Sequence, residues 1–418
     1  MEAMLHHTPL IATLVAGLTA ALLLGVAARK LHLPPLVGYL LAGVAIGPFT
    51  PGYVGDLALA QELSEIGVIL LMFGVGLHFS PRELAEARGV AVPGALCQML
   101  VATLLGWAVA RSWGWTDGQG FIFGFCLSVA STVVLLRALT DRNETATPQG
   151  KIAVGWLVVE DLAMVIALVL VPVGAALLDG RAPAGTLPVG MGNGMLLPLL
   201  LTLGKVAVFI VLMLLVGSRV LPWALSLVGG LRSRELFSLA ALVAALGVAF
   251  AASALFDASF ALGAFLSGLV LGQSALSQKA AEQTLPLRDA FAVLFFVSVG
   301  MLFDPGILLR QPLPLLAAVA VVLFGKSLAA WAIARVRGLS QREALVIAAS
   351  LAQIGEFSFI LAGLGVAEGV LPEAGRDLVL ATALLSIAAN PLMFHLADRL
   401  AARVEPAAAE AEPRPASG

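Results

Sequence analysis

The sequence predicts an all-α protein that crosses a membrane many times, and three observations indicate this. Of its 418 residues, 60% are hydrophobic and only 12% are charged, whereas soluble domains have about 45–50% and about 25%. The apolar residues form long runs, and an α-helix needs about 20 apolar residues to cross a bilayer. The 43 glycines and 22 prolines are scattered through these runs, as in helices that pack closely in a membrane. This composition excludes a cytosolic enzyme, a disordered protein and a nucleic-acid-binding protein.

Thirteen apolar runs are predicted to be membrane-spanning helices. They cover residues 9–28, 34–49, 63–79, 90–110, 119–139, 150–178, 196–222, 235–253, 257–274, 285–303, 312–334, 342–367 and 375–397. We expect residues 1–403 to form the membrane domain, and residues 404–418, rich in Ala, Pro and Glu, to form a disordered cytoplasmic tail. The N-terminal segment lacks the positive flank of a signal peptide, so we expect the first helix to stay in the mature chain.

Lysine and arginine residues predict the orientation, because cytoplasmic loops of membrane proteins are enriched in both. If the N-terminus lies outside, the outer segments hold only Arg111, Arg181, Arg310 and Arg376. Lys205 and Lys326 lie within runs, and the other eighteen of the 24 basic residues lie in inner segments. We therefore expect an external N-terminus and a cytoplasmic C-terminus in a bacterial-type inner membrane.

Two pairs of segments indicate an internal repeat. GYLLAGVAIG at 38–47 matches GAFLSGLVLG at 263–272, and VILLMFGVGLHFSP at 68–81 matches AVLFFVSVGMLFDP at 292–305. Chance similarity of apolar helices is the alternative, but Gly and Pro align at nearly the same offset in both pairs. The copies lie seven helices apart, which reverses their direction. The sequence thus predicts inverted six-helix repeats linked by the run 196–222, an arrangement frequent in secondary transporters.

Polar residues interrupt two runs at corresponding positions of the predicted repeats. The segment 128–136 contains Ser131 and Thr132, and the segment 350–359 contains Gln353, Gly355 and Glu356. Backbone unwinds at membrane depth only where protein or water satisfies its polar groups. The alternative is that the hydroxyls only bond back to the preceding helical turn. The symmetric placement favours two broken helices whose ends point at a central site.

Three charged residues are predicted to lie halfway through the membrane. Glu160 and Asp161 lie about ten residues, or about 15 Å, beyond Lys151, and Lys326 lies about as deep from Arg335. Charges at this depth are costly and are therefore functional candidates. We expect one carboxylate to pair with Lys326 and the other to face a water-filled cavity. A site that accepts either H⁺ or a cation would exchange the two, although a purely structural salt bridge is the alternative.

The remaining polar residues predict no second site. Lys205 is expected to pack or snorkel, and Asp257 is expected to cap the helix that follows it. The histidines lack ligand spacing with a carboxylate, so no transition-metal site is expected. Cys97 and Cys126 predict neither a disulfide nor a thiolate site. We therefore expect no cofactor besides the transported ions.

The acidic pair at 160–161, Lys326 and the Gly-Glu-Phe segment at 355–357 resemble the cation:proton antiporters, most closely the Kef-type and NapA-like branch. The resemblance covers about residues 9–400. It implies the NhaA-like fold, with two crossed, unwound helices in a core domain beside a dimerisation domain. It also implies elevator-like alternating access and a homodimer.

By position in this family, Asp161 matches the ion-binding aspartate, Glu160 its neighbour and Lys326 the lysine that pairs with them. The first unwound segment is matched by Ser131 and Thr132, and the second by Gln353, Gly355 and Glu356. NapA-like exchangers usually have two aspartates at the acidic pair and Kef-type systems Gln-Asp. The Glu-Asp pair therefore leaves both the ion, Na⁺ or K⁺, and the stoichiometry open. Many Kef-type chains continue into a cytosolic nucleotide-binding domain, and none is expected within this chain.

These observations predict a secondary antiporter that exchanges Na⁺ or K⁺ for H⁺ and is not an enzyme. In this interpretation Asp161 and Glu160 bind the monovalent cation or the proton. A gated potassium efflux channel is the first alternative. An organic-anion symporter of related fold is the second, although it would need a cationic pocket. A membrane-embedded enzyme is disfavoured, because no catalytic dyad or HExxH motif is present.

Overall fold

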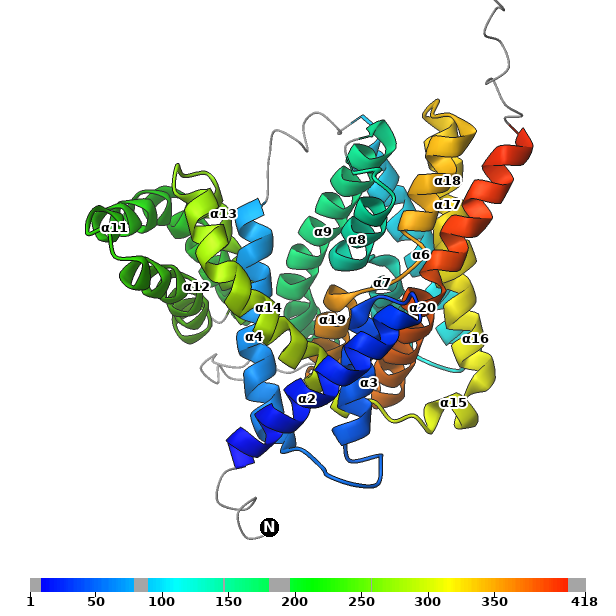
Figure 1. Ribbon diagram of the computed structural model, residues 1–418, viewed down its shortest axis with the longest axis horizontal. Helices are drawn as coiled ribbons and strands as arrows, with labels where there is room; N and C mark the ends of the chain where they lie inside the picture. Colours follow the sequence, from blue (N-terminus) through cyan, green and yellow to red (C-terminus); the bar gives the residue numbers. More distant parts are fainter. Residues whose placement is uncertain (1–8, 79–88, 146, 180–195, 257, 405–418) are drawn as a thin grey trace, which may run out of the picture. The chain divides into compact units, whose positions relative to one another are not determined.

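The computed structural model describes residues 9–78, 89–145, 147–179, 196–256 and 258–404, which form helices joined by turns and loops (Figure 1). Within these ranges, ten helical segments are long and apolar enough to cross a membrane. Three shorter apolar helices cover Pro35–Ile46, Phe260–Gly272 and Glu356–Ala367. The predicted all-α, multi-pass architecture is therefore confirmed.

The chain divides into two compact units that interleave along the sequence. The first unit comprises residues 1–82, 162–312 and 359–381. Its complete helices are α2 (Pro9–Lys30), α3 (Pro35–Ile46), α4 (Leu57–His78), α10 (Leu196–Leu212), the π-helix η1 (Met213–Gly217), α11 (Ser218–Gly230), α12 (Arg234–Phe256), α13 (Phe260–Gly272), α14 (Ser277–Met301) and α15 (Ile307–Arg310). Within this unit, α4 packs against α13 and α14, and α3 packs against α2 and α14 (Figure 1).

The second unit comprises residues 83–161, 313–358 and 382–418. Its helices are α6 (Ala91–Ser112), α7 (Asp117–Ser128), α8 (Thr132–Asp141), α16 (Pro312–Ala320), the π-helix η2 (Val321–Lys326), α17 (Ser327–Val336) and α18 (Gln341–Ser350). Three further helices, α9 (Pro148–Asp179), α19 (Glu356–Ala367) and α20 (Glu373–Val404), each contribute a part to both units. Within the second unit, α6 packs against α7, η2 and α17, while α17 packs against α18.

Glycines set the closest helix contacts of the first unit. A Cβ atom added at Gly43 of α3 would lie 2.0 Å from a carbonyl oxygen of α14 and 2.7 Å from the Cα of Gly300. A Cβ atom added at Gly268 of α13 would lie 2.1 Å from a carbonyl oxygen of α4, and one at Gly76 of α4 would lie 2.2 Å from a carbonyl oxygen of α13. The backbones therefore touch at both crossings, as small residues allow in membrane helices.

Several predicted helix boundaries differ from the structure, and three of them have a clear cause. The helix predicted to begin at residue 285 begins at Ser277, because its first two turns are polar and hydropathy does not reveal them. The run 196–222 continues as helix to Gly230 through the π-helical turn η1. The helix predicted from residue 257 begins at Phe260, where the Ser259 hydroxyl accepts the N–H of Leu262 at 3.2 Å. Asp257, the predicted cap, lies outside the described residues.

Candidate functional site

The helical run beginning at α7 is interrupted between Ser128 and Thr132, within the predicted segment 128–136. Val129 and Ser131 have extended backbone angles, and α8 begins at Thr132. The Ser131 hydroxyl accepts the N–H of Val134 at 3.2 Å and so caps α8. A serine at this position satisfies one of the free N–H groups that every helix start leaves.

The second interruption separates α18, which ends at Ser350, from α19, which begins at Glu356. Gln353 joins the two interruptions, because its Oε1 accepts the Ser131 N–H at 2.9 Å and its Nε2 donates to the Ser131 carbonyl at 3.1 Å. The Ser131 hydroxyl donates to Glu356 Oε2 at 2.7 Å. A Cβ atom at Gly355 would lie 2.3 Å from the Ser131 Cβ, so only glycine leaves room for this approach. One buried amide therefore satisfies both the backbone N–H and the backbone carbonyl of Ser131.

Glu160 and Asp161, which lie on α9, are both buried, with 0% and 5% of their surface exposed. Glu160 Oε2 accepts the Ala130 N–H at 2.7 Å in the first interruption and lies 3.9 Å from the Lys326 Nζ. Asp161 Oδ2 accepts the Thr132 hydroxyl proton at 3.2 Å. The two acids thus contact neighbouring residues of the same interruption but have different partners.

Lys326 is the last residue of the π-helix η2 and is fully buried. Its Nζ donates to the Gln353 carbonyl at 3.3 Å in addition to its ion pair with Glu160. π-helical turns are rare in proteins as a whole, but they occur often at functional sites, because they shift the direction of the side chains that follow. The lysine therefore links Glu160 to the second interruption.

The carboxylates of the site outnumber its cation. Glu160, Asp161 and Glu356 are all buried, and they bond to three consecutive residues, Ala130, Thr132 and Ser131 respectively. Glu160 Oε1 and Asp161 Oδ1 are buried and have no hydrogen-bond partner among the described residues. Buried carboxylate oxygens without partners are costly unless they hold a proton or a cation. No three His, Cys, Asp or Glu side chains of the described ranges form a group that could hold a metal ion.

All eight predicted site residues belong to the second unit. Lys205, predicted to have a packing role, belongs to α10 of the first unit.

Sequence reasoning missed Gln98 of α6, which is fully buried. Its Nε2 donates to the carbonyl of Ser128, the last residue of α7, at 3.0 Å, and its Oε1 accepts the indole N–H of Trp156 at 3.1 Å. Asn390 of α20 donates in a similar way to the Ala349 carbonyl near the end of α18, at 2.9 Å. A single amide inside an apolar run was the only available signal for either residue.

Interrupted helices around buried charges are typical of secondary transporters, and the fold and site define a membrane transporter of this class. The model of the sodium/hydrogen exchanger family (transmembrane region) matches residues 17–396. The chain belongs to this family, which confirms the predicted cation:proton antiporter membership and, with it, the exchange of a monovalent cation for H⁺.

Two curated relatives and one solved structure illustrate this membership. The chain is 58% identical over 401 residues to a protein named "Putative cation/proton antiporter YbaL" of Escherichia coli (strain K12), covering 96% of this chain and 70% of that protein. It is 34% identical to K(+) efflux antiporter 4 of Arabidopsis thaliana over 93% of this chain, but it spans only 64% of the plant protein. The structure of the sodium proton antiporter MjNhaP1 from Methanocaldococcus jannaschii at pH 8 matches with a TM-score of 0.69 and 19% identity, over 96% of this chain and 100% of that chain. That likeness supports the fold alone.

Proposed function

We propose that this chain exchanges Na⁺ or K⁺ for H⁺ by alternating access, with Asp161 as the group that holds either the cation or the proton. The observation that carries the proposal is the buried Asp161 Oδ1, which has no partner among the described residues, on a carboxylate whose other oxygen meets the Thr132 hydroxyl. A cation bound there is coordinated by the Asp161 carboxylate, a hydroxyl oxygen and backbone oxygens of the interruptions. A proton on Asp161 removes the charge that holds the cation, so the two ions compete.

Glu160 and Lys326 balance the charge of the empty site in this proposal. Their ion pair leaves Glu160 Oε1 free of partners within the described part of the chain. A cation that binds at Asp161 repels Lys326. The Glu160 carboxylate is then available to accept a second proton. This arrangement couples ion binding to the contact that joins η2 and α9.

The geometry of the site is compatible with both Na⁺ and K⁺, so transport measurements must determine which cation is exchanged. Relatives carry names with both ions, since the plant proteins are K(+) efflux antiporters and MjNhaP1 is a sodium proton antiporter. The carboxylate and hydroxyl oxygens of the site accept either ion.

The proposal includes thirteen membrane spans built as inverted six-helix repeats. Support comes from the glycine contacts, because the repeat register pairs Gly43 with Gly268 and Gly76 with Gly300. The contact between Gly43 and α14, which carries Gly300, therefore corresponds to the contact between Gly268 and α4, which carries Gly76. A two-fold relation between the repeats requires this exchange of partners.

We also propose an external N-terminus, a cytoplasmic C-terminus, a bacterial inner membrane and a homodimer. The second unit, which contains the site, corresponds in this proposal to the moving core domain, and the first unit to the dimerisation domain. The basic residues in the predicted inner segments support the orientation.

Exchange by purified protein in proteoliposomes tests this function, with Na⁺, K⁺ and Li⁺ supplied in turn and the voltage clamped by an ionophore. Asp161→Asn should abolish exchange, whereas Asp117→Asn, at the exposed start of α7, should leave it unchanged. Full exchange by the Asp161→Asn protein refutes the role of Asp161. Cation flux without proton counterflow identifies a channel instead.

A further inference from the structure

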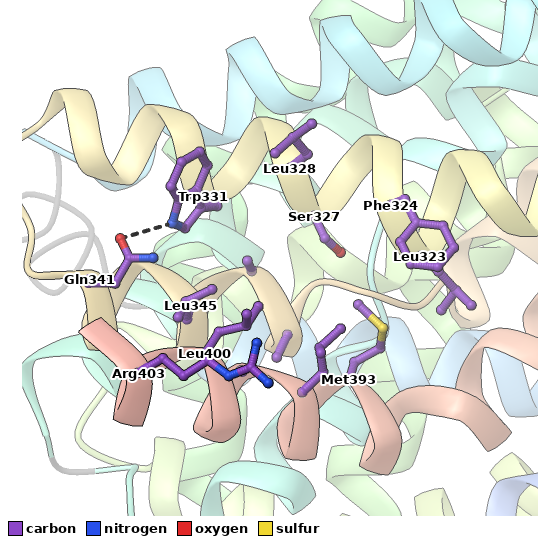
Figure 2. Close-up of a pocket in the computed structure, with 14 residues that line it drawn as sticks. Leu323, Phe324, Ser327, Leu328, Trp331, Gln341, Leu345, Met393, Leu400 and Arg403 are labelled. Atoms are coloured by element: carbon purple, nitrogen blue, oxygen red, sulfur yellow. Dashed lines mark hydrogen bonds between the residues drawn. The ribbon is translucent and has the colours of Figure 1, made fainter. Parts of the chain in front are cut away.

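The second unit contains a pocket of about 490 Å³ whose lining includes none of the eight predicted site residues (Figure 2). Its walls come from η2, α17, α18 and α20. The side chains that line it are almost all apolar, and several of them are exposed to the surroundings of the protein. Phe324 is 59% exposed, Leu328 62% and Leu400 37%. In a membrane protein, an apolar pocket open to its surroundings meets lipid rather than water.

One end of the pocket carries positive charge. Arg403, in the last turn of α20, lines the pocket and is the only charged residue among the described residues that line it. Figure 2 shows its side chain extending along α20 beside Leu400. Further arginines lie at or near the adjoining helix ends, namely Arg335, Arg337, Arg342 and Arg399, and Arg342 lies 4.0 Å from Glu144. The nearby acids are partly engaged, since Asp398 pairs with Arg142 at 2.8 Å and Glu343 accepts the Ser340 N–H at 2.8 Å.

The pocket has the depth of one membrane leaflet. Along α20 it runs from Arg403 to Met393, which is about 15 Å at 1.5 Å per residue. The hydrocarbon region of a bilayer is about 30 Å thick, so half of it is about 15 Å. On the facing side, Ser327 lines the pocket directly after Lys326, the lysine predicted to lie at mid-membrane depth. An acyl chain that begins at Arg403 would therefore end near the mid-plane.

We propose that this pocket binds one acyl chain of an anionic phospholipid, whose phosphate pairs with Arg403. Three features select this occupant: an apolar wall, a depth that matches one leaflet, and a cation where the headgroup lies. Basic pockets between membrane helices recognise anionic headgroups in this way. The simpler alternative is that Arg403 only extends to the membrane surface, as long basic side chains do.

Trp331 provides a reporter inside the pocket. It lines the wall, and its indole N–H donates to Gln341 Oε1 at 3.4 Å (Figure 2). Bromine atoms on an acyl chain quench tryptophan fluorescence on contact. The chain has six tryptophans, so the signal of Trp331 is the difference between the wild-type protein and Trp331→Phe.

The experiment titrates brominated phosphatidylglycerol, or brominated phosphatidylcholine, into phosphatidylcholine vesicles that hold the full-length protein. Half-maximal quenching of Trp331 should need about fivefold less of the anionic lipid than of the zwitterionic lipid. Arg403→Gln should remove this preference. Arg399→Gln, an exposed arginine one turn away that does not line the pocket, should retain it.

Three results overturn the proposal. Equal quenching by the two lipids removes the role of the headgroup, and an equal loss of preference in both arginine variants shows only general surface charge. The absence of Trp331 quenching by either lipid shows that something other than lipid covers the pocket. None of these readouts depends on ion transport, so the outcome is independent of the proposed function.

Discussion

Replacement of Lys326 by methionine should strongly destabilise the protein, because it leaves Glu160 buried without its cation. Both side chains are fully buried, and 3.9 Å separates Nζ from Oε2. At an effective dielectric constant of about 20, this distance corresponds to an attraction of about 4 kcal/mol. Loss of one partner of a buried ion pair costs about 3–5 kcal/mol. We expect Lys326→Met to lower the free energy of unfolding by this amount.

Removal of both charges should cost less than the two single changes together. In the Glu160→Gln/Lys326→Met protein neither member of the pair is left as a buried charge without its partner, and the amide oxygen introduced by Glu160→Gln can still accept the Ala130 N–H. We expect a coupling energy of about 2–3 kcal/mol between the two positions, within the range for residues in direct contact.

Unfolding in mixed micelles, titrated with sodium dodecyl sulfate and followed by circular dichroism, measures all four proteins of this cycle. Lys151→Met provides the control, because Lys151 is exposed in the first turn of α9, and its loss should change stability by no more than about 0.5 kcal/mol. If the double variant loses the full sum of the two single effects, the ion pair contributes no coupling and this reasoning is refuted.

Two further predictions concern the helix interruptions. Gly355→Ala should lower stability by about 3 kcal/mol, because its Cβ would overlap the opposite interruption. Gly363→Ala on α19 meets no other atom within 4 Å, so thermal unfolding should show unchanged or slightly higher stability; equal losses in the two variants would contradict the packing argument. Gln98→Leu should cost about 2–6 kcal/mol, since it leaves a buried carbonyl and a buried indole N–H without partners. If titration with sodium dodecyl sulfate shows that Gln98→Leu lowers the free energy of unfolding by less than about 1 kcal/mol, neither group depends on the Gln98 amide.

The positions of the helix interruptions were predictable because their signals are local. Ser131 and Thr132 in one run, and Gly355 in another, are polar or flexible residues where a membrane helix normally has apolar ones. The bonds that close the interruptions were not predictable, because Gln353 and Ser131 lie 222 residues apart. Nothing in either segment specifies which distant amide meets which backbone group.

Supporting residues were hidden for a related reason. Gln98 is one amide in an otherwise ordinary apolar helix, and its role depends on two partners from other helices. The depth of Lys326 could be counted along the sequence, but the π-helical turn that ends at it leaves no compositional trace. Prediction therefore found the charged groups and the polar residues of the two interruptions, and it missed buried amides outside them, such as Gln98.

The glycine crossings of α3 with α14 and of α4 with α13 have a mechanical consequence. Where main-chain atoms touch, no side chain can rotate to absorb a displacement, so one helix cannot slide along the other without a collision. Such a joint resists shear far better than a contact between flexible leucines or methionines. We therefore expect α3 with α14, and α4 with α13, to move as rigid bodies. Bending in the first unit should occur in segments outside these crossings.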